Sequence, residues 1–293
     1  MASSTPGSAM SEPLSMRALL WRRFARHKAA VVSLAFFAVI GAACALAPAI
    51  APYPFDGIDL DSVKQPPSLS HWMGTDDLGR DVLTRMLFGG RVSILIGLLA
   101  AVVGTLMGTA IGAAAGYHGG RIDNMLMRIT DVAYAIPTLP LLIILSAYSR
   151  AALVSMVLII GLLSWMTTAR VVRSQVLSIK EMDYVEAARS MGATDLRILA
   201  RHIVPNALGP ILVGATLGVG NAIMVESSLS FLGLGVQPPT PTWGNMLMDS
   251  QATMATKPWL TLFPGLAILL IVLAVNFMGD ALRDALDPGG NGR

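Results

Sequence analysis

The stretch that decides the fold lies at residues 184–206, which read YVEAARSMGATDLRILARHIVPN. Acidic and basic side chains follow one another closely in it, yet both flanks are apolar. The run before it reads ALVSMVLIIGLLSWMTTA, and the run after it reads ALGPILVGATLGVGNAIMV. A charged, helix-forming segment between two long apolar runs indicates a polar loop that joins two membrane spans.

The composition of the chain is that of a membrane protein. Its 293 residues are 54% hydrophobic and 13% charged, whereas soluble domains carry about 25% charged residues. So few charged side chains cannot cover an ordinary soluble surface. The net charge of +3 is small, and the basic residues lie between apolar runs rather than on one face. Nucleic acid is therefore not an expected partner.

Residue types that would support catalysis or metal binding are few and scattered. The single cysteine, Cys44, lies in an apolar run and permits no disulfide within the chain. The histidines at 27, 71, 118 and 202 are far apart in the sequence, so no metal site is expected. No nucleophile has a base at a suggestive spacing, and no G-x-x-x-x-G-K-[ST] phosphate loop occurs. We therefore expect a non-catalytic chain without a cofactor of its own.

Six segments are apolar enough, and long or nearly long enough, to cross a bilayer, which takes about 20 helical residues. They are residues 29–50, 92–116, 132–148, 151–169, 207–225 and 259–278. The third segment is short and contains Pro137 and Pro140, which neighbouring helices can accommodate within a span. The sequence therefore predicts an all-α polytopic membrane protein with six transmembrane helices.

These spans divide the chain into five regions. They are a tail at 1–28, a first transmembrane helix at 29–50, an outer loop at 51–90, a five-helix core at 91–280 that includes the 184–206 loop, and a tail at 281–293. The second span contains GTLMGTAIGAAAG at 104–116. Such small residues let helix backbones approach closely, and we favour this role over a glycine-lined pore.

Basic residues are distributed unevenly between the two sides of the membrane that the spans define. The two tails and the loops after the second and fourth spans hold 15 of the 21 lysines and arginines. Cytoplasmic segments carry the excess of Lys and Arg in membrane proteins. Both termini and the 184–206 loop are therefore expected in the cytoplasm.

The first part of the 184–206 loop favours a short helix over 184–190. Glu186 lies there beside Ala187 and Ala188, whose small side chains keep the helix surface low. Gly192 can adopt a positive φ and so end this helix. The expected result is a low knob of small residues that carries one carboxylate.

A second short helix is expected over 196–203, with Thr194 or Asp195 as its N-cap. An apolar stripe at i, i+3 and i+7 is predicted to consist of Leu196, Leu199 and Ile203. Two arginines lie away from that stripe, Arg197 and Arg201. Pro205 is expected to break the chain before the fifth span.

Two environments suit such a pair of short helices. Arginine-bearing amphipathic helices commonly lie on the lipid surface. An acid beside two alanines is a poor membrane anchor, however, and it favours a groove in a cytoplasmic protein.

The spacing Glu186-Ala187-Ala188-x-x-x-Gly192, followed after nine residues by His202-Ile203-Val204-Pro205, resembles the EAA loop of ABC importer permeases. The family pattern ends in Ile-x-Leu-Pro, and the variant with His202 and Val204 is similar to the peptide and nickel permease branch. In that family the loop forms a coupling helix, which docks in a cleft of the ATP-hydrolysing subunit. The resemblance implies coupling roles for Glu186, Ala187, Ala188, Gly192, Asp195, His202 and Pro205.

Three further stretches resemble the C-type subunit of dipeptide and oligopeptide permeases. They are HWMGTDDLGRDVLTRMLFGGRVSILIG at 71–97, ESSLSFLGLGVQPPTPTWGNML at 226–247 and NFMGDALRDALDPG at 276–289. Trp72 and Met73 depart from the Pro-Leu form of the first segment. The resemblance covers about residues 17–287 and implies the type I ABC importer permease fold.

The resemblance also implies a bacterial inner-membrane complex. The expected partners are a B-type sister permease, one or two ATPase subunits, an extracytoplasmic substrate-binding protein and the bilayer. ATP and magnesium would be bound by the ATPase subunits, and this chain would supply about half of the translocation path. Relatives carry dipeptides, oligopeptides, nickel, glutathione or haem, so the cargo stays open, with peptides as the first expectation.

Ionisable residues within the spans bear on an alternative class, the ion-coupled secondary transporter. Glu226, near the outer end of the fifth span, is the main candidate and is also the candidate translocation-path residue. A structural hydrogen bond is favoured for it over contact with cargo. Asp131, three residues after Arg128, is expected to form an interfacial ion pair with that arginine. Copurification with an ATPase would support the importer over the secondary transporter.

The polar outer segments suggest one more site. His71, Gly74 and Asp76, together with Trp243, are expected either to form a rim for the binding protein or to seal the outer gate. The residues alone favour neither role over the other.

The predicted orientation can be tested with single cysteines. A cysteine in place of Ser62 is expected to react with a membrane-impermeant thiol reagent added from outside, and one in place of Ser190 is not, because the two residues lie on opposite sides. The parent chain, with Cys44 alone, is the control. The reverse labelling pattern would contradict the orientation.

Overall fold

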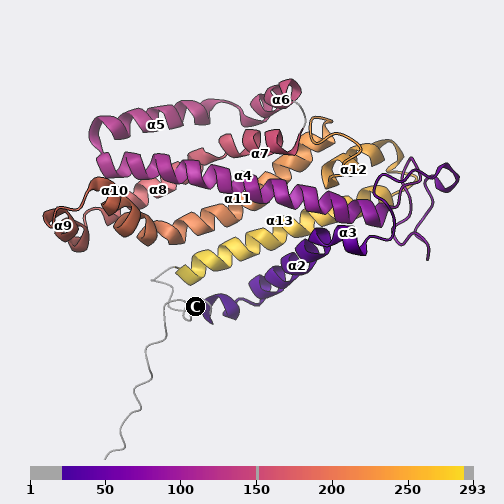
Figure 1. Ribbon diagram of the computed structural model, residues 1–293, viewed down its shortest axis with the longest axis horizontal. Coiled ribbons are helices and arrows are strands. Elements are labelled where there is room, and N and C mark those ends of the chain that lie inside the picture. Colours follow the sequence, from indigo (N-terminus) through magenta and orange to yellow (C-terminus); the bar gives the residue numbers. More distant parts are fainter. Residues whose placement is uncertain (1–21, 150–151, 287–293) are drawn as a thin grey trace, which may run out of the picture.

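All repetitive structure in the described part of the chain is helical (Figure 1). The computed structural model describes residues 22–149 and 152–286, and within them no β-strand occurs, only one isolated bridge between Thr75 and Asp81. The tails predicted at 1–28 and 281–293 lie largely outside the described residues.

The helices follow one another with short connections, except for the segments between α3 and α4 and between α11 and α12. The longer helices are α2 (Lys28–Ala45), α4 (Val82–His118), α5 (Gly120–Ala135), α6 (Thr138–Tyr148), α7 (Leu153–Leu162), α8 (Trp165–Ile179), α11 (Leu208–Phe231) and α13 (Trp259–Leu286). The shorter ones are α3 (Ala47–Ile50), η1 (Leu60–Ser62), α9 (Asp183–Ser190), α10 (Asp195–Ile198), η2 (Leu199–Ile203), η3 (Val204–Ala207), α12 (Trp243–Ser250) and η4 (Gln251–Thr253).

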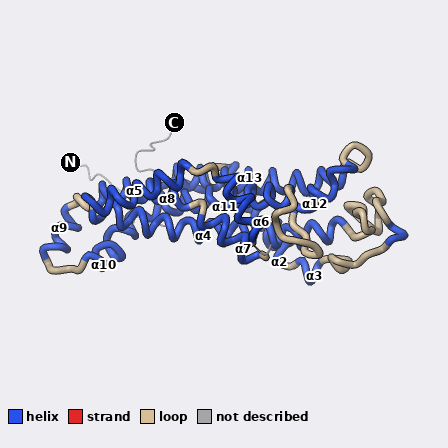
Figure 2. Tube along the Cα trace, turned by 90° about the horizontal axis from the view of Figure 1, so that it is seen from above, coloured by secondary structure: helices blue, strands red, loops and turns tan. Residues whose placement is uncertain are grey.

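The molecule is an elongated bundle whose two ends differ (Figures 1 and 2). We call them the α9 end, where α9 and α10 lie, and the α12 end, where α3, α12 and the 51–81 loop lie. The start of α2 and the end of α13 point toward the α9 end, and His27 Nε2 lies 3.9 Å from Asp284 Oδ2. The described chain therefore begins and finishes on one side of the bundle, as an even number of spans requires.

Four continuous helices and two bent pairs of helices account for six spans. The continuous helices are long and apolar enough to span a membrane alone, and they are α2, α4, the helix Asp195–Phe231 and α13. The bent pairs are α5 with α6, at 82°, and α7 with α8, at 44°. The predicted six-span all-α fold is confirmed, with two spans broken.

The third and fourth predicted spans extend further toward the α9 end than hydropathy indicated. α5 begins at Gly120 rather than at 132, and α8 ends at Ile179 rather than at 169. Both extensions contain charged residues, so a prediction based on runs of apolar residues did not include them. The break between α5 and α6 falls at Ile136, whose extended backbone follows from the proline after it.

α4 begins ten residues earlier than the predicted span, at Val82 rather than at 92. Asp81 caps it, since its Oδ2 accepts a hydrogen bond of 2.8 Å from the backbone N–H of Thr84. Arg85 and Arg91 lower the mean hydropathy of this first part, so the predicted span did not include it. With 37 residues, α4 is about 55 Å long, well beyond the roughly 30 Å of hydrocarbon.

A face of glycines joins α4 to α8. Gly104, Gly108, Gly112 and Gly116 recur every fourth residue and all face the segment 164–176. A Cβ on Gly108 would lie 2.6 Å from the carbonyl oxygen of Trp165, and one on Gly116 would lie 2.9 Å from Val176 Cβ. These glycines pack one helix against another, so the packing role predicted for them is confirmed.

Adding one methyl group to this face is expected to destabilise the protein. Gly108→Ala should lower the free energy of unfolding by about 1–3 kcal/mol, because the backbone of α8 must move away. Gly214→Ala is the matched control, since a Cβ there has no neighbour within 4 Å and alanine favours the helix by up to about 1 kcal/mol. Thermal unfolding of the purified protein in detergent measures both, and equal midpoints for the two variants would contradict the close packing.

Candidate functional site

α9 is a short amphipathic helix at the tip of the α9 end. Val185 is fully buried and Ala188 is 3% exposed, whereas Glu186 and Ala187 are exposed. Ala188 was predicted to belong to the exposed knob, and this is corrected. It lies one turn after Val185, so it shares the buried face. The exposed knob consists of Glu186 and Ala187.

Gly192 turns the chain between α9 and α10. Its φ of +84° confirms the predicted left-handed conformation. The backbone N–H of Ala193 donates to the carbonyl of Ala188 at 3.1 Å, which closes the end of α9. A Cβ on Gly192 would have nothing within 4 Å. Its backbone conformation, and not lack of space, therefore requires glycine here.

The helix after Gly192 differs from the predicted one in its buried stripe. Leu196 is 77% exposed, although it was predicted to lie on the apolar stripe. The buried positions are Ile198, Ile203 and Ala207. The five-residue step between the first two follows from the π-helical turn η2, which shifts the register of the face by one residue.

Pro205 does not break the chain before the fifth span. Helical backbone continues without interruption from Asp195 to Phe231. Because proline has no N–H, the helix passes through the π turn η2 and the 3₁₀ turn η3 around it. His202, half-buried just before it, contributes its carbonyl oxygen to a 2.5 Å hydrogen bond from Asn206 Nδ2.

Tyr117, at the last turn of α4, fixes the angle between α9 and α10. Its hydroxyl donates to Asp195 Oδ1 at 2.6 Å, and the guanidinium carbon of Arg189 lies 5.9 Å from its ring centroid. Asp195 was a candidate helix cap, but its side chain accepts this bond from 78 residues away. No local pattern marks Tyr117, so sequence reasoning missed it.

A polar cavity lies beside the exposed knob. Its volume is about 280 Å³. Its lining residues are Tyr117, Lys180, Glu181, Glu186 and Arg189. With charges of both signs, it can accept polar side chains of a partner protein. Among the residues that the structure describes, no group of three or more His, Cys, Asp or Glu is placed to hold a metal ion.

Glu226 is buried completely and is used within the chain. Ser230 Oγ donates to its Oε1 at 2.7 Å and Ser227 Oγ to its Oε2 at 3.4 Å. The hydroxyls of Ser93 and Thr242 also lie near its carboxyl group. The structure thus supports the structural role predicted for Glu226, whose two hydrogen-bond partners both lie on α11. With no exposed surface, it contacts no cargo in this conformation.

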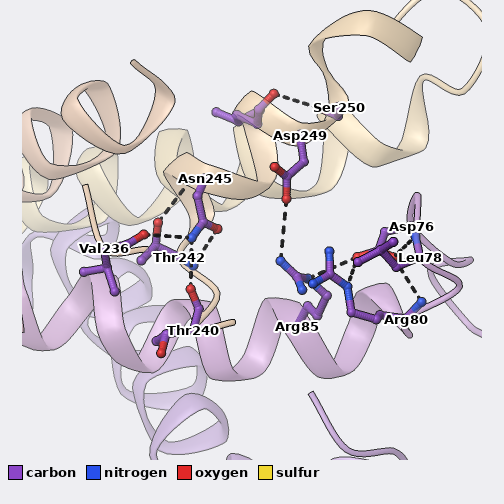
Figure 3. A network of polar contacts seen from close by, with 11 residues as sticks. Asp76, Leu78, Arg80, Arg85, Val236, Thr240, Thr242, Asn245, Asp249 and Ser250 are labelled. Carbon is purple, nitrogen blue, oxygen red and sulfur yellow. Dashed lines mark hydrogen bonds and ion pairs between the residues drawn. The ribbon is translucent and has the colours of Figure 1, made fainter. Parts of the chain in front are cut away.

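Arg85 joins the 51–81 loop to α12 at the opposite end of the bundle (Figure 3). Its Nε lies 3.4 Å from Asp76 Oδ2, and its Nη2 lies 3.7 Å from Asp249 Oδ2. Asp76 also accepts a 2.7 Å hydrogen bond from Arg80 Nε. Burial raises the pKa of the Asp249 carboxyl above its ordinary value, although the Arg85 and Arg80 guanidinium groups lower it.

The residues predicted for the rim are largely engaged inside the chain. Trp243 is 1% exposed, and its Nε1 donates to the carbonyl of Met86 at 3.0 Å. The prediction is therefore corrected for Trp243, which anchors α12 on α4. His71 Nδ1 lies 3.0 Å from Asp81 Oδ1, and Gly74 is buried. Trp72, by contrast, is 71% exposed at this end of the bundle.

Asp131 has a different partner from the one predicted. Its Oδ1 lies 2.7 Å from Arg170 Nη2, on α8, and not beside Arg128. The sequence separation of 39 residues explains why local spacing suggested the wrong arginine.

Two family models match separate parts of the chain. One is described as the binding-protein-dependent transport system inner membrane component and matches residues 108–290. This chain belongs to that family. A second model, the N-terminal TM domain of oligopeptide transport permease C, matches residues 15–67 of the permease. The resemblance to ABC importer permeases is thereby confirmed.

Relatives of this permease are similar along nearly their full lengths. The oligopeptide transport system permease protein OppC of Bacillus subtilis is 41% identical over 95% of this chain and 93% of its own. The protein of the same name from Mycobacterium tuberculosis is 39% identical over 95% of this chain and 97% of its own length. The glutathione transport system permease protein GsiD of Escherichia coli is 42% identical over 92% of this chain and 89% of its own length.

A solved structure has the same fold as the permease. It is described as an inward-facing conformation of the MetNI methionine ABC transporter, with a TM-score of 0.54 and 19% identity. The match covers 68% of this chain and 95% of the other. At that identity the likeness concerns the fold alone, and it agrees with a type I importer permease.

Removing the hydroxyl of Tyr117 is expected to loosen the α9–α10 segment of the permease. Tyr117→Phe keeps the ring but loses the bond to Asp195, at a cost of about 1 kcal/mol. Amide hydrogen exchange over 183–198 should therefore accelerate several-fold. Tyr184→Phe, whose hydroxyl has no interaction in the described residues, is the control. Equal exchange in the two variants would contradict a positioning role for Tyr117.

Proposed function

We propose that this chain is the C-type permease subunit of an ATP-driven peptide importer and that α9 is its coupling helix. One observation carries the proposal: α9 projects at one end of a six-span bundle with Glu186 and Ala187 exposed. Family membership and the oligopeptide permease relatives support the same conclusion. The chain itself performs no hydrolysis, and ATP and magnesium belong to partner ATPase subunits.

The exposed face of α9 suits a cleft in another protein. Ala187 leaves the helix surface low, so the helix can enter a narrow groove, and Glu186 then meets a basic or hydrogen-bonding group. The cavity beside it adds Lys180, Glu181 and Arg189 as further polar contacts. An acid beside a small side chain is a poor membrane anchor, so the groove is the better environment for this face.

The coupling loop leads directly into one long helix that crosses the bundle. After Gly192, helical backbone runs from Asp195 to Phe231, a length of about 55 Å at 1.5 Å per residue. Glu226, near the far end of this helix, lies near hydroxyls of α4 and of the residue before α12. A displacement of α9 by ATPase closure would pass through the Gly192 turn, which Tyr117 holds through Asp195, and then along this helix to the α12 end.

Each end of the bundle is assigned its own binding partners in this proposal. The α9 end lies in the cytoplasm of a bacterium, where the ATPase subunits bind. The α12 end faces outward, and the 51–81 loop with the exposed Trp72 is the docking surface for the external binding protein. His71, Gly74 and Asp76 shape that loop from within. A B-type sister permease completes the translocation path.

Peptides are the cargo that the relatives support best. The relatives named for oligopeptide transport align with 95% of this chain, at 41% and 39% identity. Glutathione, itself a tripeptide, is the second candidate because the permease named for it is 42% identical. The secondary transporter is disfavoured, since its main candidate, Glu226, is buried and hydrogen-bonded.

Charge reversal and added bulk on α9 test the coupling assignment. Glu186→Lys and Ala187→Trp should reduce retention of the ATPase subunits and peptide uptake by about tenfold or more, because both side chains are exposed and enter the cleft. Asp280→Lys is the matched control, an exposed acid on α13 toward the same end.

The purified complex provides the readouts, namely subunit stoichiometry and uptake into proteoliposomes. Wild-type values for both α9 variants would show that α9 is not the coupling helix. A loss of similar size in Asp280→Lys would show that any charge reversal at this end disturbs assembly.

A further inference from the structure

α5 presents its apolar side outward. Ile122, Met125, Ile129 and Val132 recur on one face, and each is about half exposed or more. The buried residues of α5 are Asp123 and Thr130, both polar. Apolar packing within this chain therefore contributes little to holding α5 on the bundle.

Two Asp–Arg pairs attach α5 to α8 instead. Arg173 Nε and Nη2 donate to the two carboxylate oxygens of Asp123 at 2.5 Å and 2.6 Å. Such bidentate pairs fix direction as well as distance. Asp131 Oδ1 accepts from Arg170 Nη2 at 2.7 Å, and the Arg170 guanidinium lies 4.6 Å from the Tyr134 ring centroid.

The two arginines lie on a helix that is itself fixed. α8 packs against the glycine face of α4, and a three-residue turn joins it to the coupling helix α9. Arg170 and Arg173 lie one turn apart on α8, whereas their partners Asp123 and Asp131 lie about two turns apart on α5. α5 is thereby held at two points along its length.

We propose that Arg170 and Arg173 are positioning residues that make α5 move together with α8, so that a displacement of the coupling helix reaches the α5–α6 span. This inference rests on the proposed function of α9. α6 follows α5 after a bend of 82°, so it is the next element along the chain that a movement of α5 reaches. The outward apolar face of α5 then moves relative to the lipid or protein surface that it contacts.

Transport per ATP hydrolysed is the first readout, measured on the whole complex in proteoliposomes. Arg173→Gln should lower the number of peptides imported per ATP by about threefold or more, with the subunit stoichiometry unchanged. Arg128→Gln is the matched control, because it removes a positive charge from α5 that has no ion pair in the described residues. The exchange Asp123→Arg with Arg173→Asp should restore most of the coupling.

A distance measurement tests the attachment without reference to transport. Spin labels at Met125 on α5 and Ser178 on α8, both exposed, should give one narrow distance distribution that is the same with and without ATP. In Arg173→Gln the distribution should broaden. If that variant does not assemble, Arg170→Gln breaks the more exposed pair and carries the same expectation.

The outcomes separate this inference from the function on which it rests. An unchanged distance distribution together with wild-type coupling in Arg173→Gln and Arg170→Gln would overturn the inference and leave α9 as the coupling helix. A broadened distribution in a chain whose α9 variants still transport normally would support the attachment of α5 and overturn the coupling assignment instead.

Discussion

The close approach of α4 and α8 is the constraint on which the rest of the structure depends. Four glycines, spaced one per turn, bring the backbone of α8 against α4 from Gly104 to Gly116. Inside a bilayer, apolar side chains gain little by leaving lipid, so close backbone packing must hold helices together. Once α8 is fixed in this way, α9 follows it after three residues, and the α9 end acquires a defined position.

Charged groups complete the assembly of the helices. Asp123 with Arg173 joins α5 to α8, Glu226 lies buried near hydroxyls of α4 and of the residue before α12, and Arg85 joins the 51–81 loop to α12. Each group is costly to bury alone and is stable only with its partner. The polar pairs therefore specify which helices are neighbours, while the glycine face determines how closely two of them pack.

The segment from α9 to α10 combines a local turn with a remote contact. Gly192 supplies the left-handed turn, and Tyr117 holds the helix after it through Asp195. The pair of short helices is thereby attached to α4. The helix from Asp195 to Phe231 stays continuous because the chain passes Pro205 through a π turn and a 3₁₀ turn.

The sequence by itself determined the six-span all-α class, the packing role of the glycine stretch and the left-handed turn at Gly192. These follow from composition, from spacing along one helix and from the conformational freedom of a single residue. Only the tertiary structure decided that Ala188 faces inward, that Trp243 is buried, that Asp131 pairs with Arg170 and that Tyr117 holds Asp195. Spacing reports which residues share a helix face, but partners 39 or 78 residues apart meet only after whole helices have packed, and no local pattern carries that information.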